Sequence, residues 1–263
     1  YTAALTVSAL SHRHCPPHRE ARDAWLKYLK DRQLTEVLGW APADREYGGW
    51  GYCHGLPHKP KAGELIPPLT ESNLSATAFA LEALAAAKAD VKPAMANALA
   101  FVKRCQNWHD DEGQRDPQFD DGGFFFIYDD SVRNKAGIAG KDKFGRTRFF
   151  SYQSATADGL NCLRICGPAA PVERLVAAER WLESGPPEGR DIMRQRPVFY
   201  YSAASTALAT RHHAQSMAES LGKLQRPDGS WVNDADAFRE HEPLVATSFA
   251  CLALARWRQY EKD

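Results

Sequence analysis

Three pairs of adjacent aspartates are the residues in this sequence whose type and spacing most suggest chemistry. The pairs are Asp110-Asp111, Asp120-Asp121 and Asp129-Asp130, all within one Gly-rich stretch. Sites for magnesium diphosphate use an aspartate-rich run on a helix, where the carboxylates converge on the metal. Because Asp and Gly favour turns, we interpret these pairs as solvated loop acids and turn formers instead. Asp121 is the one weak candidate for a catalytic residue, because it directly precedes a Gly-Gly-aromatic turn.

Histidine and cysteine form two local clusters that could be considered as metal ligands. One cluster is Cys53, His54 and His58, and the other is His12, His14, Cys15 and His18. Zinc sites need a defined ligand spacing, and neither cluster has one. We interpret both clusters as surface residues and expect neither a metal nor another cofactor. The six cysteines contain no CxxC pair that would indicate zinc binding or thiol exchange.

Eight residues, most of them aromatic, are candidates for lining a ligand cavity. They are Trp50, Tyr52, Asn73, Phe124, Tyr152, Tyr200, Tyr201 and Trp231. The tyrosines among them that open apolar helices are equally well interpreted as packing between helices, because aromatic residues dominate protein cores. Four arginines lie in connecting segments: Arg146, Arg148, Arg194 and Arg196. A guanidinium could hold an anionic group there, although a solvated loop position is the favoured interpretation for most of them.

Helices of two alternating kinds must position these residues. Helical periodicity dominates and strand alternation hardly occurs, which predicts an all-α protein. Helices of the first kind are apolar nearly all round and are expected to be buried: residues 2–10, 74–87, 152–166, 199–210 and 244–256. Helices of the second kind have a charged outer face: residues 18–33, 92–106, 171–184 and 213–225. The alternation predicts stacked helical hairpins in a single domain over residues 1–263.

Two short patterns recur with these helices. The apolar helices share a small-residue phrase around a threonine: Thr77, Thr156, Thr206 and Thr247. The amphipathic helices tend to end in a glutamine that leads to a Gly-aromatic turn: Gln33 to Gly48-Gly49-Trp50, Gln106 to Gly122-Gly123-Phe124, and Gln225 to Gly229-Ser230-Trp231. Glycine can take the positive φ that ends a helix, and a glutamine amide can bond loose backbone groups there. We assign this structural role to Gln33, Gln106, Gln225, Gly229 and Trp231.

Two connecting loops are long and rich in aromatic residues. They span residues 39–72 and 107–151 and include Trp40, Trp50, Trp108, Phe119, Phe124 and Tyr128. Long loops on one rim of a repeat fold often carry function, so we expect the functional site near them.

The segment Gln225-Arg-Pro-Asp-Gly-Ser-Trp231 resembles the QW motif of squalene and oxidosqualene cyclases. The alternating helices are similar to the α/α toroid that these cyclases share with protein prenyltransferase β subunits. The likeness extends to bacterial proteins with prenyltransferase and squalene-oxidase repeats, in the segments 73–84 and 101–106. It covers nearly the whole chain and is weakest at residues 168–198. The resemblance implies an α/α toroid of stacked hairpins that is incomplete at its N-terminus.

The resemblance also implies a test for chemistry. A class II terpene cyclase protonates an alkene with Asp-Xaa-Asp-Asp, placed before Thr-Ala on a buried helix. The corresponding positions before Thr77 hold Asn73, Ser75 and Ala76, and the other copies lack the acids as well. We therefore expect a terpenoid-cyclase-like protein that binds an apolar or isoprenoid ligand in a central cavity. If it is an enzyme, the resemblance implies a cyclase- or mutase-like isomerase or lyase with non-standard catalytic residues.

An alternative is a carbohydrate-active or protein-binding toroid scaffold, because fold alone does not fix function. The aromatic loops suit sugar stacking as well as the walls of an isoprenoid site. An apolar closed pocket would favour the lipid interpretation, and an open groove with Arg, His and Tyr would favour the glycan interpretation.

Composition limits the partners further. The chain has 263 residues, in which 33 basic side chains balance 33 acidic ones, so no nucleic acid is expected as a partner. The sequence has no apolar run near the about 20 residues that a membrane helix needs. The first helix carries apolar Leu5, Val7 and Leu10, which a preceding helix would cover in a ring. We expect a removed N-terminal segment, a second copy or a partner subunit to cover this surface beside residues 244–256.

Overall fold

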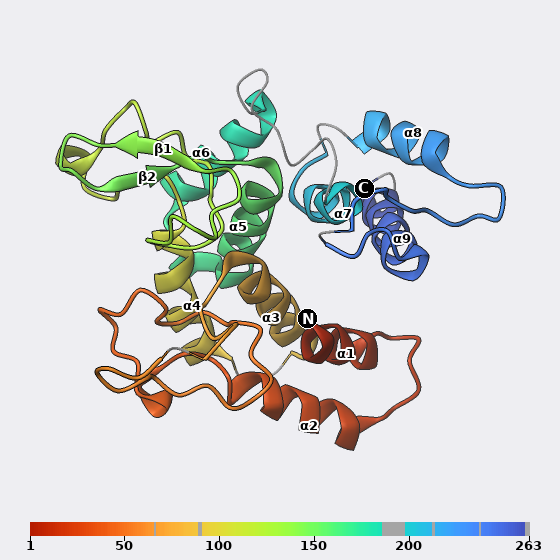
Figure 1. The fold of residues 1–263 in the computed structure, drawn as a ribbon. Coiled ribbons are helices and arrows are strands. Elements are labelled where there is room, and N and C mark those ends of the chain that lie inside the picture. The colour runs from red at the N-terminus through yellow and green to blue at the C-terminus, as the bar shows by residue number, and fades with distance from the viewer. Residues whose placement is uncertain (66, 89–90, 186–197, 212–213, 237, 261–263) are drawn as a thin grey trace. The chain divides into compact units, whose positions relative to one another are not determined.

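The computed structural model describes residues 1–65, 67–88, 91–185, 198–211, 214–236 and 238–260, and it is mainly α-helical (Figure 1). Helices, three short 3-10 turns included, make up 51% of the described residues, and nine of them are α-helices. They are α1 (Thr2–Ser11), α2 (Arg19–Lys30), α3 (Leu74–Ala86), α4 (Lys92–Arg104), α5 (Gln153–Cys166), α6 (Val172–Ser184), α7 (Phe199–Ala209), α8 (Ala214–Leu224) and α9 (Pro243–Tyr260). Every helix expected from the sequence is present, and the all-α class is confirmed.

Contacts divide the chain into two compact units. Unit 1 comprises residues 1–106, 126–135 and 162–175, and unit 2 comprises residues 107–125, 136–161 and 176–263. Helices α5 and α6 therefore contribute residues to both units. The single domain over residues 1–263 stays a prediction, as does the toroid.

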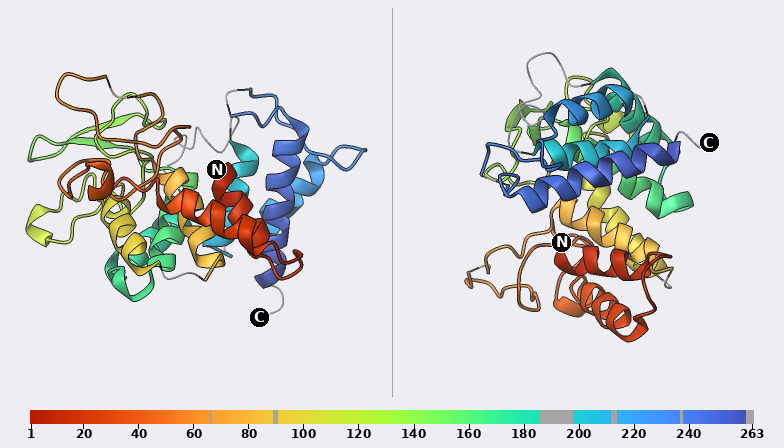
Figure 2. Two further views of the ribbon diagram at one scale, coloured as in Figure 1. Left: turned by 90° about the horizontal axis from the view of Figure 1, so that it is seen from below. Right: turned by 90° about the vertical axis from the view of Figure 1, so that its right-hand side faces the viewer.

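In unit 1, α1 lies beside α2 and α3 (Figures 1 and 2). The predicted burial holds for α3, whose Leu74, Leu81 and Leu84 are fully buried. Helix α1 differs, because Val7 is buried whereas Leu5 is 45% exposed. The apolar pattern of α1 is therefore covered on one side, by α2 and α3.

In unit 2, α7 and α9 pack through small side chains. The residues at this core include Ala203, Ala204 and Ala207 from α7, and Ala246, Ala250 and Ala253 from α9. Small residues allow two helices to approach closely, and Trp231 and Trp257 fill the remaining space. The opposite side of α9 is exposed, with Leu244 82% accessible and Cys251 also exposed. This helix was expected to be buried on most sides, and it is buried on one.

A short β-hairpin interrupts the long loop 107–151, where the sequence analysis expected no strand. Strand β1 (Ile138–Lys141) pairs antiparallel with β2 (Thr147–Phe149), with Lys141 opposite Thr147. Asp142 accepts hydrogen bonds from the backbone N–H groups of Phe144 and Arg146, each at 3.0 Å, and so forms the turn between the strands. The hairpin depends on this local carboxylate, which strand periodicity does not reveal.

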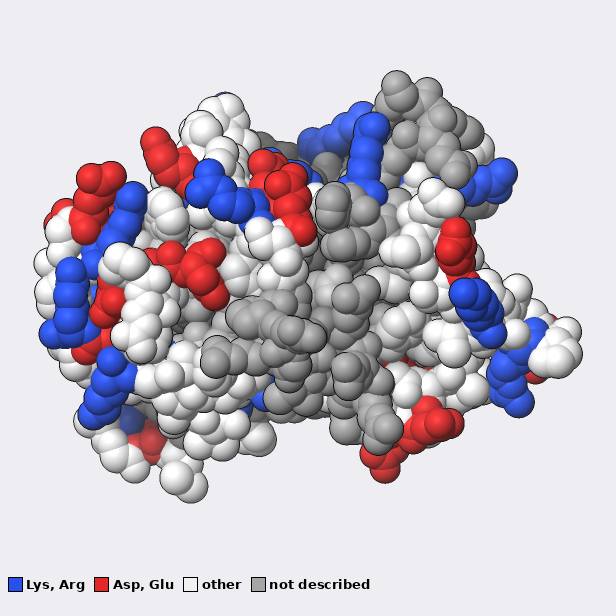
Figure 3. Space-filling model, turned by 90° about the horizontal axis from the view of Figure 1, so that it is seen from above, with Lys and Arg blue, Asp and Glu red and all other residues white. Residues whose placement is uncertain are grey.

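The surface carries mixed charge. On the face shown in Figure 3, basic and acidic side chains are interspersed rather than gathered into one patch of either sign. Within the part of the chain that the structure describes, no helix is long and apolar enough to cross a membrane.

Candidate functional site

The repeated Gly-aromatic turn is built from a small set of hydrogen bonds, which the first copy shows in full. The Gln33 side-chain amide donates to the carbonyl oxygens of Gly48 and of Ala94 on α4, both at 2.8 Å. The indole N–H of Trp50 donates to the Leu29 carbonyl oxygen at 2.8 Å. The turn is thereby tied to α2, which precedes it, and to α4.

A threonine ties each turn to the following apolar helix. The backbone N–H of Trp50 donates to the hydroxyl oxygen of Thr77 on α3 at 3.2 Å. The same bond joins Phe124 to Thr156 and Trp231 to Thr247, both at 3.0 Å. This bond accounts for three of the four threonines of the small-residue phrase, whereas the Thr206 hydroxyl oxygen accepts from the Gln153 amide at 3.4 Å.

The other copies repeat further parts of the arrangement. The Trp231 indole N–H donates to the carbonyl oxygen of Leu221 at 2.8 Å, and Leu221 precedes Gln225 by as many residues as Leu29 precedes Gln33. The Gln106 amide donates to the carbonyl oxygen of Arg174 on α6 at 2.9 Å. These contacts support the structural role that the sequence assigned to the glutamines and to Trp231.

Burial narrows the eight candidates for ligand contact. Six of them are at most 4% exposed: Trp50, Asn73, Phe124, Tyr152, Tyr200 and Trp231. Asn73 caps α3, because its side-chain oxygen accepts a bond from the Ala76 backbone N–H at 2.9 Å. Tyr52 and Tyr201 are the two candidates with partly exposed side chains. Both lie at the N-terminal end of an apolar helix.

In unit 1, the Tyr52 hydroxyl belongs to a cluster whose side chains are uncharged. It lies 2.6 Å from the Ser75 hydroxyl oxygen, and the Tyr1 hydroxyl lies within 2.9 Å of both. The Tyr1 ring stacks on Tyr52 with centroids 5.1 Å apart and meets Phe79 edge to face at 4.6 Å. We call Tyr1, Tyr52, Ser75 and Phe79 the hydroxyl end.

In unit 2, Tyr201 has an ionisable partner. Its hydroxyl donates to the Asp158 carboxylate of α5, and Asp158 is 5% exposed. Its ring meets Phe249 edge to face, with centroids 5.6 Å apart. We call Asp158, Tyr201 and Phe249 the carboxylate end.

Sequence reasoning missed Asp158, although a signal was present. It lies two residues after Thr156, and the same position after the other threonines holds Phe79, Leu208 and Phe249. An aspartate among apolar residues at one position of a repeat marks a local difference in chemistry.

A second buried carboxylate, Glu240, holds the start of α7. It accepts from the backbone N–H groups of Tyr200 at 3.2 Å and Tyr201 at 2.8 Å, and from the Asn233 amide at 2.9 Å. Glu240 is 1% exposed, and burial raises its pKa even though these bonds favour the ionised form. Its position in an irregular loop gave no sequence signal.

Asp121, the weak catalytic candidate, accepts three hydrogen bonds at its turn. One carboxylate oxygen accepts from the Ser151 hydroxyl at 2.7 Å and from the Gly123 N–H at 2.9 Å, and the other accepts from the Trp181 indole at 3.1 Å. Burial raises its pKa. Asp228 of the Gln225 turn makes the corresponding bond to the Ser230 N–H at 3.0 Å. These contacts describe a turn residue, and a catalytic role for Asp121 stays a prediction.

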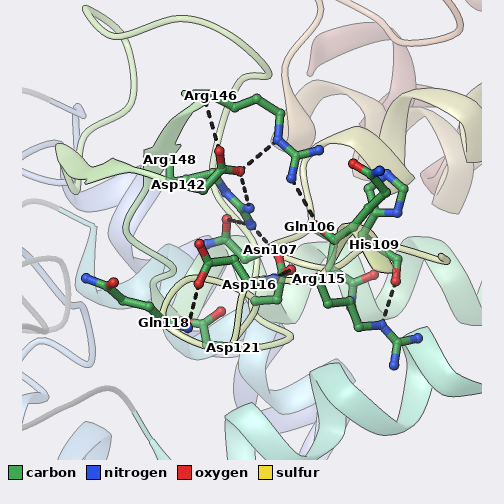
Figure 4. Close-up of polar contacts among 12 residues, drawn as sticks. Gln106, Asn107, His109, Arg115, Asp116, Gln118, Asp121, Asp142, Arg146 and Arg148 are labelled. Atoms are coloured by element: carbon green, nitrogen blue, oxygen red, sulfur yellow. Dashed lines mark hydrogen bonds and ion pairs between the residues drawn. The ribbon is translucent and has the colours of Figure 1, made fainter. Parts of the chain in front are cut away.

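The arginines of this loop are paired with acids (Figure 4). Arg148 contacts Asp120 and Asp142, and Arg146 donates to Asp142 at 2.7 Å. Burial opposes ionisation of Asp142, but the bonds from Arg146 and other donors prevail and lower its pKa to about 2. The charges balance within this network, which argues for a structural role over anion binding. Arg194 and Arg196 lie outside the described residues.

The histidine and cysteine clusters show no metal geometry. The His12 and His14 rings lie 5.3 Å apart. Among the described residues, no group of three or more His, Cys, Asp or Glu side chains could hold a metal ion.

Comparison with known proteins gives no relative: no protein-family model matches the chain, and no curated protein matches its sequence.

Proposed function

We propose that this chain is a terpenoid-cyclase-like repeat protein, with the hairpins of an α/α toroid, that binds an apolar or isoprenoid ligand at the ends of its apolar helices. The observation that supports this proposal is the threonine-anchored Gly-aromatic turn, which is built with the same hydrogen bond in three copies. The resemblance to cyclases rests on this turn and on the alternation of helices.

The ligand is bound without protonation by an Asp-Xaa-Asp-Asp acid. On α3 the positions of that motif hold Asn73, Ser75 and Ala76. Asn73 is occupied as a helix cap, and its carboxamide N–H groups are far too weakly acidic to protonate an alkene. The expected behaviour is binding of prenyl compounds with no cyclised product.

The carboxylate end selects the polar group of the ligand. Because the Tyr201 proton is donated to Asp158, any further bond to the phenol oxygen must come from a donor. A prenyl alcohol supplies a donor, whereas a diphosphate supplies only acceptors and negative charge near a buried carboxylate. The rings of Tyr201 and Phe249 provide the apolar wall for the chain.

Titration with three matched ligands tests this function. Geranylgeraniol, its diphosphate and the hydrocarbon squalene are each titrated into the protein, followed by intrinsic fluorescence, and the mixtures are analysed by mass spectrometry. We expect the alcohol to bind at least about tenfold more tightly than the diphosphate, a difference of about 1.4 kcal/mol. Failure of all three to bind would refute the lipid proposal, and a cyclised product at enzymatic rate would refute the absence of protonation.

The hydroxyl end favours the alternative, a carbohydrate-binding scaffold. Stacked Tyr1 and Tyr52 rings beside three mutually bonded hydroxyls offer both the apolar face and the hydrogen bonds that a sugar ring uses. A panel of oligosaccharides in the same titration decides between the two. Saturable binding of a glycan, lost in Tyr52→Ala, together with no binding of prenyl compounds would favour the scaffold.

A further inference from the structure

The turn glycines differ in what lies against them. Gly48 has φ +91°, and a methyl group added there would lie 1.9 Å from the carbonyl oxygen of Asn97 on α4. Gly122 has φ +83°, and its methyl group would lie 2.8 Å from the carbonyl oxygen of Ala177 on α6. Gly229 has φ +84° in the same turn, but among the described residues only the Gln225 amide lies within 4 Å of the added methyl group. Two turns are thus packed against the backbone of a following helix and the third is open.

The glutamines show the same contrast. Gln33 and Gln106 are 6% and 4% exposed, and each donates to a carbonyl oxygen of the following helix, Ala94 or Arg174. Gln225 is exposed, and in the described part of the chain its amide donates to Gly229 of its own turn at 2.9 Å. The Gln225 turn therefore presents the groups that the other two use to hold a helix.

The packed turns meet their helices at equivalent places. Ala94 and Asn97 are the third and sixth residues of α4, and Arg174 and Ala177 are the third and sixth residues of α6. In both cases the glutamine meets the third residue and the glycine meets the sixth. Both turns contact backbone atoms of their helix, and in the second the Arg174 guanidinium also donates to the Gln106 side-chain oxygen at 3.0 Å. The shared requirement is a helix whose third and sixth residues leave the backbone accessible.

Helix α2 has exposed residues at the same two positions, the third and the sixth. It begins at Arg19, fourteen residues before Gln33, just as α4 begins at Lys92, fourteen residues before Gln106. Its third and sixth residues are Ala21 and Ala24, and both are exposed. Small side chains at these positions leave the backbone open to an approaching turn.

We propose that the turn 225–231 of one copy of this chain docks on α2 of a second copy. The Gln225 amide would donate to the Ala21 carbonyl oxygen, and Gly229 would lie against the backbone of Ala24. Because the two surfaces differ, the contact is head to tail and yields a closed ring or an open chain of copies. A turn on one helix is a small interface, so the association belongs to the weak class.

Solution mass with a matched pair of variants tests the interface. Wild type should show concentration-dependent association in sedimentation up to about 100 µM, within the range of weak complexes. Gly229→Ala should weaken this association at least tenfold, because its methyl group occupies the space of the partner backbone. Gly145→Ala is the control: Gly145 has φ +78°, and no atom of the described part of the chain would lie within 4 Å of the added methyl group, so the variant carries similar backbone strain in another exposed turn.

Cross-linking defines the geometry. With Cys15, Cys53 and Cys251 replaced by serine, Arg226→Cys and Glu20→Cys, at exposed neighbours of the proposed contact, are prepared as separate proteins and mixed with a short bis-maleimide. A cross-linked dimer that forms in the mixture, and not in either protein alone, supports the head-to-tail contact. A monomer at all concentrations, an association that Gly229→Ala leaves unchanged, or a mixture that does not cross-link overturns the proposal.

Discussion

The turn at Gln33–Trp50 in unit 1 and the turn at Gln225–Trp231 in unit 2 share their hydrogen bonds and differ in their surroundings. In both, the indole N–H donates to the carbonyl oxygen of a leucine in the preceding helix, and the tryptophan backbone N–H donates to a threonine hydroxyl. The first turn is covered by α4, and the second is exposed. The local residue pattern therefore determines which hydrogen bonds the turn makes. The neighbouring helix determines how much each bond contributes to the stability of the fold.

The apolar helix ends of the two units differ in the same way. The hydroxyl end of unit 1 is neutral, whereas the carboxylate end of unit 2 contains Asp158 and lies beside Glu240. A common scaffold thus carries two kinds of chemistry, and substitutions in equivalent places should have unequal effects.

The turn glycines should show the largest difference. Gly48→Ala combines positive-φ strain with a clash against the Asn97 carbonyl group, and we expect a loss of about 2–5 kcal/mol in unfolding free energy. Gly229→Ala carries the strain alone, and we expect about 1–2 kcal/mol. Urea denaturation of both variants measures the two losses in unfolding free energy. Equal losses would show that the two turns have the same surroundings in solution.

The anchor threonines should differ less. Thr77 is fully buried, so Thr77→Val leaves the Trp50 N–H without its acceptor and away from water, at a cost of about 1–3 kcal/mol. Thr247 is partly exposed, so water can replace its hydroxyl in Thr247→Val, and we expect about 0.5–1.5 kcal/mol. Thermal unfolding of the two valine variants tests this order, and a larger loss at Thr247 would contradict it.

The pH dependence of stability should separate the two ends. Burial raises the pKa of Glu240, so the folded state keeps this proton at pH values where the unfolded state has released it. Stability from this group is therefore fully present below its ordinary pKa of 4.5 and is lost as pH rises through the raised folded value. The Glu240→Gln variant should lack this decline in stability with rising pH, whereas Ser75→Ala at the hydroxyl end should keep it. Parallel pH profiles for wild type and Glu240→Gln would contradict the assignment.

The smallest effect is expected at the hydroxyl end. Tyr52→Phe removes one partly exposed hydroxyl from a neutral cluster, and we expect a loss of about 0.5–1.5 kcal/mol that does not change with pH. Chemical denaturation at two pH values measures this loss in unfolding free energy. A loss that varied with pH would show that an ionisable group takes part in this cluster.

The helices and the turns could be predicted from the sequence because both depend on local pattern. Apolar periodicity predicted all the helices, and the segment Gln225–Trp231 predicted the turn that occurs in three copies in the structure. The hairpin at 138–149 could not be predicted, because the turn at Asp142 makes it rather than strand alternation.

The site was predicted less completely than the fold. Tyr52 and Tyr201 were among the candidates, but burial alone separates them from the six others. The partner of Tyr201 comes from another helix, and only tertiary structure brings Asp158 to it. The exposed side of α9 likewise depends on what packs beside it, which sequence periodicity does not report.

The ratio of alcohol to diphosphate affinity in wild type and in Asp158→Asn tests the central claim most directly. Asparagine keeps an oxygen that can accept the Tyr201 proton while removing the negative charge, so the fold and the apolar wall remain. We predict that wild type prefers geranylgeraniol to its diphosphate at least about tenfold, and that this preference falls substantially in Asp158→Asn. The absence of prenyl binding, or an unchanged ratio in the variant, would contradict the account.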